Sequence, residues 1–399
     1  MQSSKGNFSV IEILFFLFLS LCFLGISYTS IETGFNEGGI AERSNGLFVL
    51  GIIILTIANS LFIKGQVSRR FDSIDAILWI YSTLFIISFL SVKSSSFTDI
   101  YDCISKILWV FCFNLGRKIG TLNAKKKDSF IMLFVIVVII PILIFGFQKY
   151  QSTVLLFTDE NRDVSFNIIA YFPFVLFIIK RKLFKTILVF VFFVIVIFSF
   201  KRSGILAVFM ATLIFIVLSI NSKTMKKYLF SWYALALLVG GFFLFNYLNE
   251  SVGEYVRTRF ELMSEDGGSN RNGIYSTLIN AFWRADPISF FFGHGYRSTF
   301  DYVGVLAHND LLQVFFDLGV VGGCLYLVFI LSLFKNVFRH FKMRRSSNDY
   351  AAFSAAVAML VMLTSFNCFI YSFSMLSPLM FCLGFGNESL RSANRQLNL

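Results

Sequence analysis

The sequence has few charged residues for its length. Asp, Glu, Lys and Arg make up only 15% of its 399 residues, whereas a soluble domain carries about a quarter. The shortage argues against a soluble enzyme, a nucleic-acid-binding module and a disordered protein. The chain also has no G-x-x-x-x-G-K-[ST] loop, so nothing indicates nucleotide hydrolysis. Its six cysteines lie inside apolar runs without C-x-x-C spacing, so we expect small buried side chains rather than disulfides or metal ligands.

Apolar residues are abundant instead. They make up 56% of the chain, which contains 53 phenylalanines and has a mean hydropathy of +0.73. A membrane-spanning helix needs about 20 apolar residues. The sequence therefore predicts an all-α, polytopic integral membrane protein, with residues 1–399 forming one transmembrane domain. About twelve transmembrane helices are expected, at residues 8–29, 46–63, 74–92, 99–116, 129–148, 164–180, 185–200, 203–220, 229–248, 308–334, 351–371 and 374–387.

The basic residues indicate the orientation of these helices. The net charge of +12 is spread over short clusters between apolar runs, which is typical of cytoplasmic loops rather than of a nucleic-acid-binding surface. With the N-terminus in the cytoplasm, 23 of the 35 Lys and Arg residues fall on the cytoplasmic side. We therefore expect both termini in the cytoplasm. The first apolar run is too long for a signal peptide and is expected to remain as a helix.

One long connection, residues 249–307, is predicted to lie on the outer, periplasmic face. All five of its basic residues are arginines, although lysine outnumbers arginine 18 to 12 elsewhere. Arginine binds phosphate oxygens in pairs, which lysine cannot do. Apolar spacing predicts two short helices in this loop, one at residues 252–263 and one through residues 274–282. This face contains no D-x-D motif that could hold a divalent metal ion. No metal site is therefore predicted, and arginines would neutralise a bound anion.

Two outward-facing cationic positions precede predicted helices. Lys201 and Arg202 form a tight turn before the eighth helix, and Arg271 precedes the helical stretch in the loop. A guanidinium beside the N-terminus of a helix is a suitable anion site. The alternatives are snorkelling to lipid headgroups for the first position and a solvated loop arginine for the second.

His308 and Asn309 open the predicted tenth helix. A histidine at a helix N-terminus near cations is expected to have a lowered pKa and to act as a neutral base. Such a base can accept the proton of a hydroxyl nucleophile. The alternative is an interfacial histidine that caps its helix. His294, between two glycines, is expected to mark a tight turn.

Together these segments resemble the bacterial O-antigen polymerase/ligase superfamily. The similar motifs are Asn167-Ile168-Ile169-Ala170, Arg202-Ser203-Gly204, Arg271, Asp286-Pro287, Gly293-His294-Gly295, Ala307-His308-Asn309-Asp310-Leu311-Leu312 and Gly319-Val320-Val321-Gly322. They cover about residues 160–335, while the first 150 residues are similar only as apolar spans. Lys201 departs from the commoner Ser-Arg-Ser-Gly form of the second motif, although the arginine is kept.

The resemblance implies a bacterial inner-membrane glycosyltransferase that acts at the periplasmic face, inverting and independent of metals or other cofactors. Its donor would be an undecaprenyl-diphosphate-linked oligosaccharide in the lipid bilayer. Arg202 and Arg271 would bind the diphosphate, and His308 would be the catalytic residue. Supporting roles would fall to Asn309, Asn167, Lys201 and Arg297.

Three activities fit this resemblance. An O-antigen polymerase, the first candidate, joins lipid-linked repeat units in surface polysaccharide or lipopolysaccharide biosynthesis, and a chain-length regulator protein is a candidate partner. An O-antigen ligase would transfer the glycan to lipid A-core. A flippase or transporter for lipid-linked glycans is the lesser alternative, because few ionisable residues are expected at mid-span.

Overall fold

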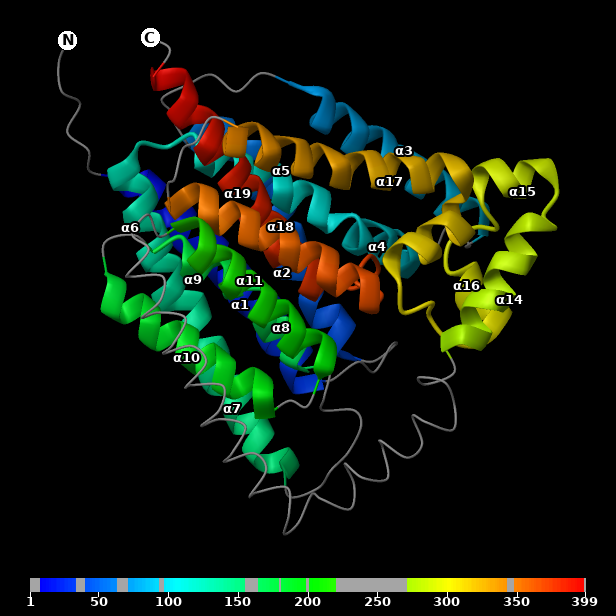
Figure 1. The fold of residues 1–399 in the computed structure, drawn as a ribbon, viewed down its shortest axis with the longest axis horizontal. Coiled ribbons are helices and arrows are strands. Elements are labelled where there is room, and N and C mark those ends of the chain that lie inside the picture. The colour runs from blue at the N-terminus through cyan, green and yellow to red at the C-terminus, as the bar shows by residue number, and fades with distance from the viewer. Residues whose placement is uncertain are drawn as a thin grey trace.

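The computed structural model describes residues 8–33, 40–62, 71–92, 97–154, 164–178, 181–198, 201–219, 271–342 and 348–397. These residues form helices and no strand (Figure 1). The first half contains α1 (Val10–Thr33), α2 (Ile40–Phe62), α3 (Ser73–Val92), α4 (Phe97–Lys106), α5 (Leu108–Gly120), α6 (Ala124–Phe134), the π-helical turn η1 (Val135–Ile139), α7 (Ile140–Val154), α8 (Val164–Ile169), α9 (Phe172–Leu176), α10 (Lys182–Phe198) and α11 (Arg202–Ser219). The second half contains α14 (Arg271–Trp283), α15 (Pro287–Phe292), α16 (Ser298–Val303), α17 (Asp310–Lys342), α18 (Asn348–Phe366) and α19 (Phe373–Leu397).

The predicted helices agree with the observed ones. Each predicted span within the described residues coincides with one helix or with consecutive short helices. In the part of the chain that the structure describes, five stretches are long and apolar enough to cross a membrane: Val10–Ile31, Ser73–Ser91, Ala124–Lys149, Asp310–Phe341 and Asn348–Phe366. The all-helical class and the membrane character are therefore confirmed. The total of twelve spans stays a prediction, and the helices expected at 229–248 and 252–263 lie outside the described residues.

Helices α5 and α19 are packed backbone to backbone. A Cβ atom added to Gly116 of α5 would lie 2.1 Å from the carbonyl oxygen of Phe381, and one added to Gly384 of α19 would lie 2.0 Å from that of Phe113. Small residues are common where membrane helices approach closely, because they allow extensive van der Waals contact. The two glycines therefore set the distance between these helices.

Phenylalanine rings fill the space around this pair. Phe134 of α6 stacks on Phe174 of α9, with ring centroids 4.7 Å apart, and Phe174 stacks on Phe381 of α19 at 5.4 Å. Phe23 of α1 completes the cluster, 5.0 Å from Phe381. All four side chains are buried. Much of the high phenylalanine content thus serves the interior packing of helices distant in sequence.

A buried arginine connects α3, α5 and α19. Arg117 is only 1% exposed, and its guanidinium lies 2.8 Å from Asp72, 2.8 Å from Asp75 and 3.2 Å from Glu388. Arg391 of α19 also pairs with Asp72. Burial alone would raise the pKa of Asp72, but its hydrogen bonds and Coulombic attraction to Arg117 and Arg391 hold that pKa well below its usual range. The cluster thus combines two arginines with three carboxylates and links three helices.

The cysteines need one correction. Cys22, Cys103, Cys112 and Cys382 are buried as expected, but Cys324 of α17 is exposed. Its helix carries other exposed apolar side chains, Leu327, Val328 and Leu331, so apolar residues on this face indicate lipid contact rather than burial inside the protein.

Helix α17 is interrupted at Gly319, which has φ 68° and ψ −171°. The carbonyl oxygens of Phe316 and Asp317, just before the break, accept hydrogen bonds from the backbone N–H groups of His294 and Gly295, at 3.1 Å and 3.0 Å. Gly293 and Gly319 lie against each other, since a Cβ atom on Gly319 would be 2.4 Å from the Gly293 nitrogen. The expected turn at His294 is confirmed, and it packs into the break.

Replacing Gly319 by alanine is expected to destabilise the protein more than the same change at Gly304. Both residues have positive φ, at 68° and 75°, which costs a non-glycine residue about 1–2 kcal/mol. Gly304 has open space around it, whereas a Cβ atom on Gly319 would also collide with the backbone of Phe291 and Gly293. Denaturant unfolding in detergent should show the larger loss for Gly319→Ala. Equal losses would mean that the close backbone approach is unimportant.

Candidate functional site

Asn309 caps α17. Its side-chain Oδ1 accepts the backbone N–H of Leu312 at 2.9 Å, and its Nδ2 donates to the carbonyl oxygen of Ser365 at 3.1 Å. This is the hydrogen-bond pattern of an N-cap residue. The alternative in which His308 caps the helix is therefore wrong, because the helix starts at Asp310 and Asn309 caps it.

His308 precedes this cap in an unusual conformation. It is exposed and has a φ of 52°, in the left-handed region that non-glycine residues seldom adopt. Its carbonyl oxygen lies 3.5 Å from the hydroxyl of Tyr275 in α14. Hydrogen bonds thus hold the His308 carbonyl and the next residue, Asn309, in place, while the His308 side chain is exposed at the surface.

Arg271 lies in α14 (Arg271–Trp283), which packs against α16 and α17. The predicted apolar face is confirmed, since Leu278 is buried with Ala307 and Phe316. Arg271 lies one turn before Tyr275, whose hydroxyl contacts the His308 carbonyl oxygen, so α14 brings an arginine to the neighbourhood of His308.

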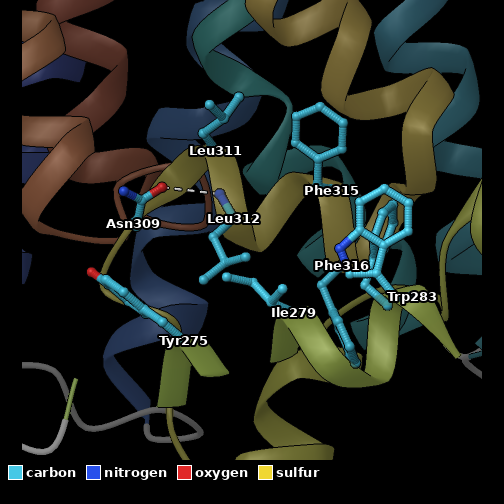
Figure 2. Close-up of a pocket in the computed structure, with 9 residues that line it drawn as sticks. Tyr275, Ile279, Trp283, Asn309, Leu311, Leu312, Phe315 and Phe316 are labelled. Atoms are coloured by element: carbon cyan, nitrogen blue, oxygen red, sulfur yellow. Dashed lines mark hydrogen bonds between the residues drawn. The ribbon is translucent and has the colours of Figure 1, made fainter. Parts of the chain in front are cut away.

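An apolar cavity of about 340 Å³ lies between α14 and the first turns of α17 (Figure 2). Tyr275 and Asn309 supply the polar groups at one side. The remaining walls are apolar: Ile279, Phe282, Trp283, Leu311, Leu312, Phe315 and Phe316. A cavity of this size and character is typical of a small-ligand site with an apolar ligand portion.

Arg202 opens α11, as predicted, although its side chain lies outside the described part of the structure. The Nζ atom of neighbouring Lys201 lies 5.8 Å from the ring centroid of Phe166 in α8. Ser203 exchanges hydrogen bonds with Asn367, at 3.2 Å and 3.3 Å. The start of α11 is therefore attached both to α8 and to the end of α18.

Asn167 lies in α8, beside this attachment. Its side chain is 1% exposed, and its Oδ1 atom is buried without a hydrogen-bond partner among the described residues. The preceding Phe166 ring contacts Phe369, with centroids 5.2 Å apart. An unsatisfied buried acceptor is costly, so this amide is a reasonable candidate for contact with a bound donor group.

Arg297 is placed differently. It has a φ of 58°, begins the short helix α16, and its guanidinium carbon lies 5.1 Å from the ring centroid of Phe300. The next two residues, Ser298 and Thr299, donate to the carboxylate of Asp317 at 2.8–2.9 Å. Asp317 lies eight residues beyond Asn309, roughly 12 Å along the helix, so these contacts of α16 lie about two turns from the start of α17.

The connection between α18 and α19 joins the other candidate segments. Asp310 binds it at Phe369 and Ser203 binds it at Asn367, while Asn309 binds Ser365 in the last turn of α18. The structure thus brings the starts of α11 and α17 to one short stretch of chain. Tyr275 adds the α14 segment through its contact with the His308 carbonyl.

A sequence profile of a protein family described as O-antigen ligase matches residues 187–327. This match supports the resemblance of the chain to the O-antigen polymerase/ligase superfamily. The match runs from α10 to the middle of α17, across the starts of α11, α14 and α17. No curated protein is significantly similar to the chain.

The superfamily motifs of this chain divide into two groups. Some have structural roles: the Asp286 carboxylate caps α15 by accepting from Ile288 and Ser289, at 3.0 Å and 3.2 Å, and Pro287 fits the first turn of that helix. Hydrogen bonds to the side chain and backbone of Ser289 lower the pKa of Asp286. His308 and Arg271 have no such capping role in the structure. His308 directly precedes Asn309, which lines the cavity, and Arg271 lies one turn before Tyr275, which also lines it, so both remain candidates for chemistry.

Sequence reasoning missed the buried acids of α17. Asp310 is fully buried and accepts the backbone N–H groups of Phe369 and Ile370 at 2.6 Å and 3.0 Å. Asp317 is also fully buried and accepts from Gln313 at 2.6 Å and from Tyr371 at 2.5 Å. Helical spacing gave no signal for their partners Phe369, Ile370 and Tyr371, which lie 54–60 residues away in sequence. Among the described residues, no group of three His, Cys, Asp or Glu side chains could hold a metal.

Proposed function

We propose that the protein transfers a glycan from an undecaprenyl-diphosphate carrier to an acceptor hydroxyl at the periplasmic face of a bacterial inner membrane. The first candidate is an O-antigen polymerase, whose acceptor is a second lipid-linked repeat unit. Two observations carry the proposal, both within or next to the segment that matches this family. An apolar cavity lies between α14 and α17, and the starts of α11 and α17 are hydrogen-bonded to one stretch of chain after α18.

In this proposal, different residues accept the proton and stabilise the leaving group. The acceptor oxygen attacks the anomeric carbon from the side opposite the diphosphate, which inverts the configuration as the carbon–oxygen bond to the diphosphate breaks. His308 accepts the hydroxyl proton, while Arg202 and Arg271 stabilise the negative charge that develops on the leaving diphosphate. Arginines take the place of a metal ion in this scheme. Asn309 and Asn167 support the site, and Lys201 and Arg297 add positive charge around it.

The apolar cavity supports a lipid-linked donor. A diphosphate bound near Arg271 carries its lipid portion directly beside it, and the cavity walls are nearly all aliphatic or aromatic (Figure 2). Burial of apolar surface there would contribute about 25 cal/mol per Å².

The arrangement of the helices supports the proposed topology. Helices α14, α15 and α16 lie at one end of the long axis of the molecule, and the C-terminal end of α19 lies at the other (Figure 1). Helix α17 runs between these ends. A periplasmic catalytic face and a cytoplasmic C-terminus are consistent with this separation.

An O-antigen ligase is the second candidate, because the matching family profile carries that description. A strain lacking the gene distinguishes the two activities when its lipopolysaccharide is separated on a silver-stained gel. Core with a single repeat unit would establish a polymerase, and bare core with long polymer left on its lipid carrier would establish a ligase. An unchanged ladder would contradict both.

Arg271→Ala is expected to reduce transfer by about 10²-fold, because one of two charge-stabilising groups at the leaving diphosphate is lost. Arg284→Ala is the matched control, since Arg284 directly follows the other end of α14. Initial rates are measured with lipid-linked oligosaccharide extracted from the deletion strain. Equal rates for the two variants would exclude Arg271 from the diphosphate site.

Ile279→Ala is expected to raise the KM for the lipid-linked donor about fivefold, because part of an apolar wall is removed, at a cost of about 1 kcal/mol. Ile288→Ala provides the comparison. Both side chains are exposed, at 45% and 74%, but only Ile279 lines the cavity. A change in KM that is the same in both variants would show that the cavity does not bind the donor.

A further inference from the structure

Two candidate segments are attached to the same turn of chain between α18 and α19. On one side, Asn309 donates to Ser365, and the Asp310 carboxylate accepts the N–H groups of Phe369 and Ile370. On the other side, Ser203 exchanges hydrogen bonds with the Asn367 side chain. The attachment points at Asn367 and Phe369 are two residues apart, which corresponds to at most about 7 Å of chain.

The attachment to α17 is rigid. Asp310 is fully buried, and in addition to the two backbone N–H groups it accepts the hydroxyl of Tyr326 at 3.2 Å. Three hydrogen bonds thus converge on one buried carboxyl group. The turn therefore moves with the first turn of α17, and with His308 just before it.

The attachment to α11 depends on one side chain. Asn367 donates from Nδ2 to Ser203 Oγ, and its Oδ1 accepts from the same hydroxyl. The Nδ2 group also lies 3.1 Å from the Leu363 carbonyl in the last turns of α18, which orients the amide before it meets Ser203. Ser203 follows Arg202 directly in the chain.

We propose that Asn367 is a positioning residue for glycan transfer. It fixes the start of α11, and with it the diphosphate-binding position at Arg202, relative to His308. This role rests on the proposed function. Asn367 follows α18 and lies outside residues 187–327, which match the family profile. The matched segment therefore depends on a contact with a residue that the match does not include.

The role predicts a loss of rate without a loss of fold. Half-buried neutral hydrogen bonds of this kind contribute about 0.5–1.5 kcal/mol each, whereas a displacement of about 1 Å in a catalytic group can cost 10²-fold in rate. Asn367→Ala should therefore lower kcat by at least tenfold and leave the unfolding temperature in detergent within the range of its control.

The control is Thr364→Val. Thr364 lies one turn earlier in α18, and its hydroxyl bonds the carbonyl oxygens of Leu360 and Val361 in the same helix. This variant removes a buried hydrogen bond without touching α11 or α17, and it should keep the wild-type kcat.

Kinetics are measured on the full-length protein, with lipid-linked oligosaccharide extracted from the deletion strain as donor. Ser203→Ala, Asn367→Ala and the double variant should show nearly the same kcat, because each breaks one interaction. Ser203→Thr keeps the hydroxyl and should keep kcat within about threefold.

Three outcomes would overturn the proposal: wild-type kcat in Asn367→Ala, additive losses in the double variant, or a kcat loss in Thr364→Val equal to that in Asn367→Ala. A loss in His308→Ala together with wild-type activity in Asn367→Ala would overturn the positioning role alone. Full activity in His308→Ala would instead overturn the proposed function, and the positioning role with it.

Discussion

Replacing His308 by alanine is expected to abolish detectable glycan transfer, with a loss of about 10²- to 10⁴-fold, the usual contribution of a positioned proton acceptor. The structure gives the physical reason. Asn309, the next residue, is held by two side-chain hydrogen bonds. The backbone at His308 is strained, with φ 52°, and its carbonyl oxygen lies 3.5 Å from the hydroxyl of Tyr275 in α14. Alanine removes the proton acceptor and leaves the helix cap intact, so the fold should be unaffected.

His340→Ala is the control for this experiment. His340 lies near the other end of α17, where its ring is 6.2 Å from that of Tyr350. Both variants are compared for expression, membrane insertion and initial rate. Transfer at the wild-type rate in His308→Ala would remove the histidine from the mechanism, and an equal loss in both variants would point to the stability of α17 instead.

The helices could be predicted from sequence because their signal is local. Runs of apolar residues predicted the spans, and apolar spacing in residues 274–282 predicted α14, including the buried position of Leu278. The position of Arg202 at the start of a helix also followed from local pattern. Such features depend on residues three or four apart.

The contacts that assemble the site could not be predicted in this way. Asn367 meets Ser203 across 164 residues, and Asp310 meets Phe369 across 59. Nothing in the spacing of these residues distinguishes them from other polar groups near helix ends. Likewise, the break at Gly319 packs against Gly293, a residue from a separate segment of the chain. Local spacing around Gly319 does not indicate this contact. Arg117 was predicted as one of many cytoplasmic cations, yet it is buried.

Arg117→Ala is expected to destabilise the protein by about 3–5 kcal/mol, the usual cost of removing one partner from a buried ion pair. Arg117 is 1% exposed, while Asp75 and Glu388 are 1% and 0% exposed. Without the guanidinium, these two carboxylates would stay buried in α3 and α19 with no cation between them. The free energy of unfolding is measured by denaturant titration in detergent.

Two variants separate the charge from the geometry. Lys118→Ala removes the neighbouring cation of α5, which has no part in the cluster, and should change the free energy of unfolding by less than about 1 kcal/mol. Arg117→Lys keeps the charge but loses the planar fork that contacts Asp72 and Asp75 together, so its loss should lie between the two. If Arg117→Ala were no less stable than Lys118→Ala, the ion cluster would not hold α3, α5 and α19 together. In that case the glycines of α5 and α19, rather than the charges, would be the main source of their association, because close packing would then be sufficient.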